Sequence, residues 1–348
     1  MTGKIPPRIM EKLVYSKLGV IDPSVLVGPA IGEDAAIIDL GDGRVLVVHN
    51  DAITGASEFL GWLAVHIVSN DIAVRGARPK WFLMSLFLPE NTSKDFLERI
   101  MSQVDEAAKE LGMMVIGGHT ETTSNLDRPI VGTTAIGIVG KDKAVTTSGA
   151  RAGDYVIMTK TAAIEGTAIL CTDFAGILRN KGVDEKVLEK GSKFLAKVSV
   201  MKEALALAER GLATSMHDPT EGGILGGVAE IAYASRKTIE LWADKLPIAK
   251  ETKLITETLR IDPLKLISSG ALVATVPPDR VEEALKTLRM LDIESTVIGR
   301  VHDYSDCLVK VVKNSSMEFV SDVYVYDELF RLWKKIKVEK KAHLNVKK

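Results

Sequence analysis

Cysteine is nearly absent from the chain, with only Cys171 and Cys307. Two cysteines outside any Cys-x-x-Cys pair cannot form a disulfide framework, so we expect a reducing, cytoplasmic environment. Gln103 is the only glutamine while Lys and Glu are plentiful, which is typical of a thermophilic source. No apolar run approaches the roughly 18 residues of a membrane helix. The net charge of −1 indicates no general affinity for nucleic acid or for a membrane.

Several common signatures of nucleotide, hydrolase and protease sites are also missing. The sequence has no Gly-x-x-x-x-Gly-Lys-Ser/Thr loop, no Gly-x-Gly-x-x-Gly after a strand, no Gly-x-Ser-x-Gly and no His-Glu-x-x-His. Residues 1–12 mix charged residues with two prolines and lack the apolar stretch of a signal peptide. The four missing motifs count against P-loop, Rossmann, α/β-hydrolase and zincin folds.

The first half of the chain alternates strand and helix patterns. A β-branched run over 44–50 follows a Gly-Asp-Gly turn and predicts a hairpin with 34–40. Helical spacing of apolar residues within 55–74 predicts a helix, in a region that Pro79 ends. The remaining elements expected here are a strand over 81–88, a helix from a cap at Thr92 or Ser93 to Gly112, a strand over 113–116 ending at a Gly117-Gly118 turn, and a strand over 130–139. This order predicts an α+β sheet with helices on one face.

A turn-rich segment over 148–154 predicts the domain boundary. We expect an amino-terminal domain over 1–148, a carboxy-terminal α+β domain over 149–340 and a solvated basic tail over 341–348. The elements expected in the second domain are strands over 155–159, 212–216, 271–276 and 294–299, and helices over 199–209, 222–234 and 280–290.

The candidate functional residues are acidic residues that lie beside glycines or at the ends of predicted elements. They are Glu33 and Asp34 after Gly32, Asp51 after a strand, Asp71 next to Asn70 in a helix, and Asp218 in the segment that contains Thr220, Gly222 and Gly223. Magnesium ions prefer carboxylate oxygens together with phosphate and water. Polyphosphates also need backbone N–H groups that glycine lets approach closely. The pattern therefore predicts a way to hold Mg-ATP without a P-loop.

Each residue also has a purely structural interpretation. Asp34 fits a turn, Asp51 a strand end, and Asn70-Asp71 a solvated helix face, while Gly117-Gly118 fits a tight turn as well as an anion cradle. The 218–223 segment indicates a ligand more sharply, because two glycines opening a helix leave free N–H groups at its positive end.

The combination and order of these motifs resemble the aminoimidazole-ribonucleotide (AIR) synthase superfamily over about residues 28–300. The motifs are Gly-Glu-Asp-Ala-Ala at 32–36, Asp51, Ser-Asn-Asp-Ile-Ala-Val-Arg-Gly-Ala-Arg-Pro at 69–79, Gly-Gly-His-Thr-Glu at 117–121, Thr-Ala-Ile-Gly-Ile-Val-Gly at 134–140, Arg-Ala-Gly-Asp-Tyr-Val at 151–156, Asp-Pro-Thr-Glu-Gly-Gly at 218–223 and Ile-Asp-Pro-Leu-Lys-Leu-Ile-Ser-Ser-Gly-Ala-Leu at 261–272. The last two are most similar to the hydrogenase-maturation (HypE) branch.

The resemblance implies a two-domain ATP-dependent enzyme and a homodimer whose amino-terminal sheets form a central barrel. It implies ATP and Mg²⁺ as cofactors, a cleft near the dimer interface, and phosphoryl transfer that activates a small substrate. The nucleotide-binding positions implied are Gly32, Asp34, Asp51, Asn70, Asp71, Gly117, Gly118, His119, Thr120, Glu121, Asp218, Thr220, Gly222 and Gly223. The metal ligands implied are Asp34, Asp51, Asp71 and Glu121.

Two departures from the HypE pattern stand out. His119 occupies a position where HypE has Asp, and a histidine is a poor substitute for a magnesium carboxylate. HypE also ends on a cysteine that carries its carbamoyl group, whereas this sequence ends on Lys347 and Lys348. We expect both cysteines of this chain to be buried and unreactive.

Three functional hypotheses follow. The first is an ATP-dependent HypE-like paralogue acting on a small molecule that the sequence does not identify. The second is a hydrogenase-maturation protein proper, with a maturation partner protein. The third is a non-catalytic nucleotide-binding scaffold, which the histidine at a metal-ligand position favours and which an ATPase assay separates from the first.

Overall fold

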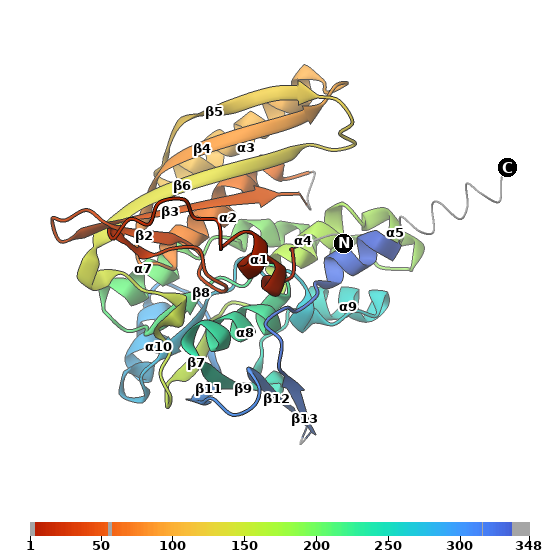
Figure 1. The fold of residues 1–348 in the computed structure, drawn as a ribbon. Helices are drawn as coiled ribbons and strands as arrows, with labels where there is room; N and C mark the ends of the chain where they lie inside the picture. The colour runs from red at the N-terminus through yellow and green to blue at the C-terminus, as the bar shows by residue number, and fades with distance from the viewer. Residues whose placement is uncertain (1–3, 55–57, 315, 336–348) are drawn as a thin grey trace.

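A computed structural model of the chain describes residues 4–54, 58–314 and 316–335 (Figure 1). The fold is α+β, with two sheets that each carry helices. The predicted basic tail over 341–348 lies outside the described residues. Among those described, no helix combines the length and the apolar composition needed to cross a bilayer.

The first sheet has six strands in the order β1-β2-β3-β6-β4-β5. The elements of this half are α1 (Pro7–Leu13), β1 (Val25–Val27), β2 (Ala36–Asp39), β3 (Arg44–Ile53), α2 (Leu60–Ala73), β4 (Arg78–Pro89), α3 (Lys94–Leu111), β5 (Met114–Thr123) and β6 (Ile130–Gly140). Among the described strands of this sheet, only β4 and β5 pair in parallel. The predicted hairpin is confirmed, because β2 and β3 pair antiparallel with Ile37 opposite Val47.

Helices α2 and α3 cover one face of this sheet. Alternate residues of β4, such as Phe82, Leu86 and Leu88, are buried in the same core as both helices, while the residues between them are half-buried. The Ser93 hydroxyl accepts a hydrogen bond from the Phe96 N–H at the start of α3, and Gly112 ends α3 in the left-handed conformation. Both ends of this helix are therefore as the sequence predicted.

One prediction about this half is wrong, and one strand begins earlier than predicted. β4 starts at Arg78 rather than at 81, so it includes Pro79, and its ladder to β6 is irregular between Pro79 and Trp81 because proline has no N–H to donate. The Gly117-Gly118 turn and the loop expected at 117–121 do not exist, since β5 continues as a strand to Thr123. Gly118 allows this continuation because a Cβ there would collide with the Met84 backbone on the paired strand.

The second sheet has seven strands in the order β13-β12-β9-β11-β7-β10-β8. Its strands are β7 (Tyr155–Thr159), β8 (Ser215–His217), β9 (Lys237–Trp242), β10 (Val273–Val276), β11 (Ser295–Asp303), β12 (Val309–Lys313) and β13 (Ser316–Val320). The helices are α4 (Ile164–Thr172), α5 (Ala175–Asn180), α6 (Glu185–Ser192), α7 (Met201–Glu209), α8 (Gly223–Ser235), α9 (Lys250–Leu259) and α10 (Val281–Met290).

Side chains of β7 alternate between two cores on opposite faces of the second sheet. Val156 and Met158 share a core with α8 residues, whereas Ile157 shares the larger core with α7 and α10. The larger core also contains α2, so it runs from one half of the molecule into the other. Helix α2 is buried along nearly its whole length as a result.

We predict that Gly118→Ala lowers the free energy of unfolding by about 2 kcal/mol, because the added methyl group has no room beside β4. Chemical denaturation measures the change. Gly132→Ala on β6 is the matched control, since a Cβ there meets no atom within 4 Å. Equal stability of the two variants would contradict this explanation of the glycine.

Candidate functional site

The four aspartates singled out by the sequence line one cavity of about 260 Å³ between the two halves of the molecule. Asp34 precedes β2, Asp51 lies near the end of β3, Asp71 lies in the last turn of α2, and Asp218 follows β8. Gly32 and Thr220 also line this cavity. We call it the acidic cavity. The structure thus brings together residues that are up to about 180 positions apart in the sequence.

Arg75 holds two of the acidic residues beside this cavity in place. Its guanidinium group is fully buried and lies 2.8 Å from Glu33 Oε2 and 2.9 Å from Asp34 Oδ2. It also donates to the backbone carbonyl of Met216 in β8. Glu33 additionally accepts hydrogen bonds of 3.0 Å from the Thr147 N–H and the Ser148 N–H. One side chain therefore joins the first half to the second beside the cavity.

His217 holds Asp34 from the opposite side. Its Nδ1 lies 2.5 Å from Asp34 Oδ1 and its Nε2 lies 2.8 Å from Glu230 Oε2. Burial alone would lower the pKa of His217, but the adjacent carboxylates raise it to about 10. The ring therefore carries a positive charge beside the carboxylates of Asp34 and Glu230 and serves as their counter-charge.

Asp71 and Asp218 are the carboxylates without such partners. Both are buried, and neither oxygen of Asp218 has a hydrogen-bond partner among the described residues. Burial, followed by the neighbouring charge of Asp218, raises the pKa of Asp71 well above its usual range. Burial, followed by the charge of Asp34, does the same for Asp218. Buried oxygens without partners indicate a site completed by a ligand.

His49 does not neutralise this surplus of negative charge. Its Nε2 lies 3.7 Å from Asp71 Oδ2, but burial lowers the pKa of His49 to about 4, which leaves the ring neutral at pH 7. Asp51 adds to the surplus, and burial together with the charge of Glu221 raises its pKa to about 6. A hard divalent cation fits such a set of oxygen donors.

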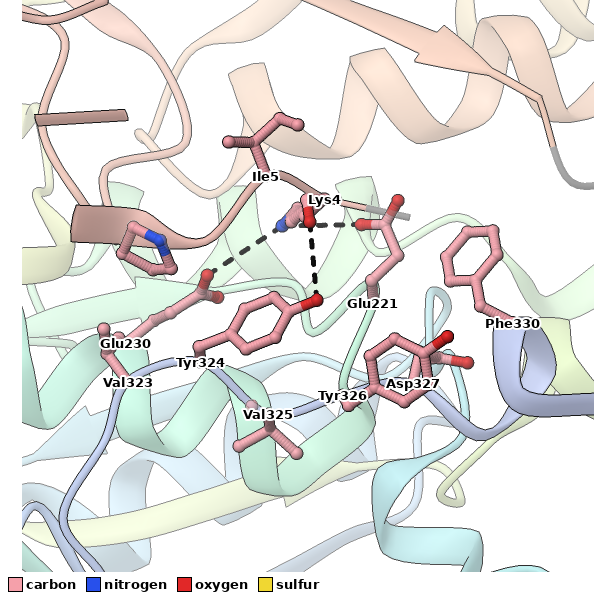
Figure 2. A pocket seen from close by; sticks show the side chains of 12 residues that line it. Lys4, Ile5, Glu221, Glu230, Val323, Tyr324, Val325, Tyr326, Asp327 and Phe330 are labelled. Carbon is pink, nitrogen blue, oxygen red and sulfur yellow. Dashed lines mark hydrogen bonds and ion pairs between the residues drawn. The ribbon is translucent and has the colours of Figure 1, made fainter. Parts of the chain in front are cut away.

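Lys4 is a cavity residue that the sequence analysis missed. Figure 2 shows its ammonium group between Glu221 and Glu230, with Nζ–oxygen distances of 3.4 Å and 3.8 Å. Tyr324 donates a hydrogen bond of 3.4 Å to the Lys4 carbonyl. Among the described residues that line the acidic cavity, Lys4 is the one lysine or arginine. No motif surrounds it, so no sequence signal could have found it.

The glycines at the start of α8 do not present free N–H groups, which corrects the prediction for 222–223. The Gly222 N–H donates to Asp327 Oδ2 at 2.7 Å, and the Gly223 N–H donates to the Thr220 carbonyl. A Cβ at Gly222 would lie 2.8 Å from the Val325 carbonyl oxygen. These glycines therefore let a later segment of the same chain pack against α8, and neither lines the acidic cavity.

Asn70 also has a structural task. Its side-chain amide donates to the Val198 carbonyl at 2.8 Å and accepts from the Val200 N–H at 2.9 Å. Both ends of the amide are thus engaged in joining α2 to the second half. The structure does not place Asn70 in the acidic cavity.

The segment 117–121 lies on β5, at the edge of the first sheet. Strands β6 and β4 separate β5 from β3, which carries Asp51. The implied positions Gly117, Gly118, His119, Thr120 and Glu121 are exposed there, and His119 Nε2 lies 3.0 Å from Glu121 Oε2. None of these residues lines the acidic cavity of the same chain. Their role toward nucleotide or metal stays a prediction.

Both cysteines are buried, at 4% exposure each, as predicted. Burial raises the pKa of the Cys171 thiol to about 12, so it is not a thiolate at neutral pH.

Another buried acid, Glu165 in the first turn of α4, lines a smaller cavity together with Asp51 and Glu221. The Ser269 hydroxyl donates to it, and burial raises its pKa to about 8. Because the folded-state pKa exceeds the ordinary value of 4.5, the stability that Glu165 contributes is complete below about pH 4.5 and is lost as the pH rises through about 8.

We predict that Glu165→Gln, which cannot ionise, gains stability relative to the parent protein as the pH rises from about 5 to about 8.5. Thermal unfolding measures the difference, with an expected relative gain of roughly 5 °C across this range. The exposed Glu106→Gln on α3 is the control and leaves the pH profile unchanged. Parallel profiles for Glu165→Gln and the parent would show that Glu165 is ionised in the folded protein.

Comparison with known proteins identifies the family. The family models for the amino-terminal and carboxy-terminal domains of AIR synthase related protein match residues 32–139 and 151–310. A putative hydrogenase expression/formation protein of Methanocaldococcus jannaschii is 29% identical over 291 residues, which cover 82% of this chain and 84% of that protein. Carbamoyl dehydratase HypE of Rhizobium leguminosarum bv. viciae is 28% identical, with coverage of 81% and 80%.

The fold is likewise shared with a solved structure, hydrogenase maturation protein HypE in complex with ATP. The TM-score is 0.69 at 23% identity, with 92% of this chain and 96% of that chain covered. The resemblance drawn from the motifs and the α+β two-domain fold are both confirmed. The chain belongs to the AIR synthase related protein family.

Proposed function

We propose that this protein is an ATP-dependent enzyme that binds Mg-ATP in the acidic cavity and activates a small substrate by phosphoryl transfer. The observation that carries the proposal is the pair of buried carboxylates of Asp71 and Asp218. Asp71 Oδ2 and both oxygens of Asp218 lack hydrogen-bond partners among the described residues. A divalent cation would satisfy them, and the cation would bring the nucleotide phosphates with it. The ATP complex of the similar HypE supports the same assignment.

The residues of the cavity would have two roles. Some would bind the cation, and others would keep neighbouring charged groups ionised and in position. Asp71, Asp218 and Asp51 would hold Mg²⁺, which would neutralise charge on the phosphates. Arg75 and His217 keep Asp34 ionised: burial would raise the pKa of Asp34, but these two cations hold it below its usual range. Lys4, which lines the acidic cavity, would offer its ammonium group to phosphate oxygens. Positioning and charge stabilisation are what phosphoryl transfer requires of a protein.

We predict that Asp71→Asn weakens Mg-ATP binding at least tenfold and reduces its dependence on magnesium, because one cation ligand is lost. Isothermal titration calorimetry with and without Mg²⁺ measures both effects. Asp105→Asn is the matched control, since Asp105 is exposed on α3 and pairs with Lys109. Unchanged affinity in a folded Asp71→Asn protein would remove Asp71 from the site.

We also propose a homodimer formed through the first sheet. β5 is an edge strand, and its apolar residues Met114, Val115 and Ile116 are exposed at 66%, 39% and 47%. A second copy would cover this surface and pair an otherwise open edge. It would also place the partner copy's 117–121 segment near a cleft, as the family resemblance implies, and give His119 and Glu121 a route to the nucleotide.

We predict that the parent protein sediments as a dimer at micromolar concentration and that Met114→Lys weakens the dimer at least tenfold, because a charge is buried at the contact. Met317→Lys is the matched control on β13, another edge strand, where Met317 is 51% exposed. A monomeric parent, or equal effects of the two variants, would refute the β5 contact.

The second candidate is carbamoyl dehydratase activity in hydrogenase maturation with a partner protein, which the names of the similar proteins favour. That chemistry, by the HypE resemblance, needs an accessible thiol. Cys171 and Cys307 are both buried. The structure therefore supports the small-molecule phosphoryl transfer hypothesis better.

A further inference from the structure

The segment 218–222, which connects β8 to α8, forms part of the wall of the acidic cavity. Asp218, Thr220 and Glu221 of this segment all line the cavity. Because neither oxygen of Asp218 has a hydrogen-bond partner among the described residues, the position of this carboxylate depends on the backbone that carries it. A contact that fixes the backbone of 218–222 therefore also places a cation ligand of the proposed site.

Gly222, the last residue of this segment, is held by a residue 105 positions away in the sequence. Its N–H donates to Asp327 Oδ2 at 2.7 Å, and Asp327 is buried, at 3% exposure. The φ angle of Gly222 is 86°, in the left-handed region, and an added Cβ would lie 2.8 Å from the Val325 carbonyl oxygen. Glycine alone combines this backbone conformation with so close an approach. The residue type at 222 thus permits the contact between 323–327 and the start of α8.

The second oxygen of the same carboxylate fixes Asp327 itself. Its Oδ1 accepts a hydrogen bond of 2.7 Å from the Leu329 N–H, so Asp327 caps the helix that begins at 328. The two oxygens therefore bond to backbone groups of two different segments. This arrangement also pairs the Gly222 N–H, which would otherwise be a buried donor without an acceptor.

The segment that Asp327 anchors borders the site. Residues 323–327 line a small cavity together with Glu221 (Figure 2). Leu329 and Phe330, which follow in the chain, line the cavity that contains Glu165. Glu221 lines both of these cavities and the acidic cavity as well. The carboxy-terminal part of the described chain is thus packed against the same segment that carries the acids of the site.

We propose that Asp327 is a positioning residue of the nucleotide site. By accepting the Gly222 N–H, its carboxylate holds the segment 218–222 at the acidic cavity and so sets where the carboxylate of Asp218 meets a cation. Asp327 does not line the acidic cavity, and it acts on the site through Gly222. The role toward the nucleotide rests on the proposed function, whereas the hold on the segment rests on the contact alone.

The test compares Asp327→Ser with the parent protein as full-length chains. Serine still caps the helix through the Leu329 N–H, but it has one side-chain oxygen and leaves the Gly222 N–H without its acceptor. We predict that the Gly222 amide of the nucleotide-free variant exchanges with deuterium at least tenfold faster, and that Mg-ATP binds at least fivefold more weakly by calorimetry. Asp184→Ser is the matched control, because Asp184 caps α6 through the Lys186 N–H and does not line the acidic cavity.

A second control separates positioning from a general loss of stability. Thr238→Val in β9 also removes a buried side-chain acceptor of a backbone N–H, that of Ser305 at 2.9 Å, and Thr238 does not line the acidic cavity. We expect this variant to have a lower melting temperature, as Asp327→Ser does, but an unchanged affinity for Mg-ATP. Equal weakening of Mg-ATP binding by the two variants would overturn the positioning role.

The two measurements also distinguish this inference from the proposed function. Unchanged exchange of the Gly222 amide in Asp327→Ser would show that Asp327 does not hold the segment, and faster exchange at unchanged Mg-ATP affinity would show that the contact is structural only. Either result overturns the proposal. Failure of Mg-ATP to bind the parent would instead overturn the proposed function, and the exchange rates would still show whether Asp327 fixes the segment.

Discussion

The buried guanidinium group of Arg75 is the contact on which the site depends. Arg75 follows α2 in the chain, pairs with Glu33 and Asp34, which precede β2, and donates to the Met216 carbonyl in the second sheet. A fully buried arginine needs partners for its charge, and both terminal nitrogens of Arg75 have them. Its partners belong to both halves of the molecule, so satisfying it sets their relative position. The acidic cavity lies between these two halves, so its shape depends on the contacts of Arg75.

The acidic residues in and around the cavity fall into two groups, according to whether a cationic side chain pairs with them. Asp34 and Glu230 share the His217 imidazolium, and Glu33 and Asp34 share Arg75, so their charges are balanced inside the protein. Asp71 and Asp218 have no such counter-charge, and their pKa values rise in response. Protonation at these carboxyls and binding of a cation are alternatives, because both remove the same unfavourable buried charge. Such a site carries uncompensated negative charge that a bound metal–nucleotide complex would neutralise.

The sequence predicted the acidic cavity through residues that sit at the ends of elements. Asp51, Asp71 and Asp218 could be predicted as site residues because a carboxylate near the end of a strand or helix lies next to a loop, and ligands commonly bind at loops. Asn70 and Gly222 were assigned to the nucleotide because the local pattern does not reveal partners such as Val198 or Asp327, which are over 100 positions away. Lys4 could not be predicted for the same reason. The turn at 117–118 was wrong because glycine marks a close approach between strands as well as a turn.

The central claim is that Asp71 and Asp218 face a cation that carries the nucleotide. Anomalous diffraction at the manganese edge, from crystals of the protein grown with Mn²⁺ and a non-hydrolysable ATP analogue, tests it most directly. We expect a manganese peak within coordination distance of both carboxylates, with phosphate oxygens completing its shell. A nucleotide bound with its metal elsewhere, or both carboxylates still without a cation in a nucleotide-bound crystal, would contradict the claim.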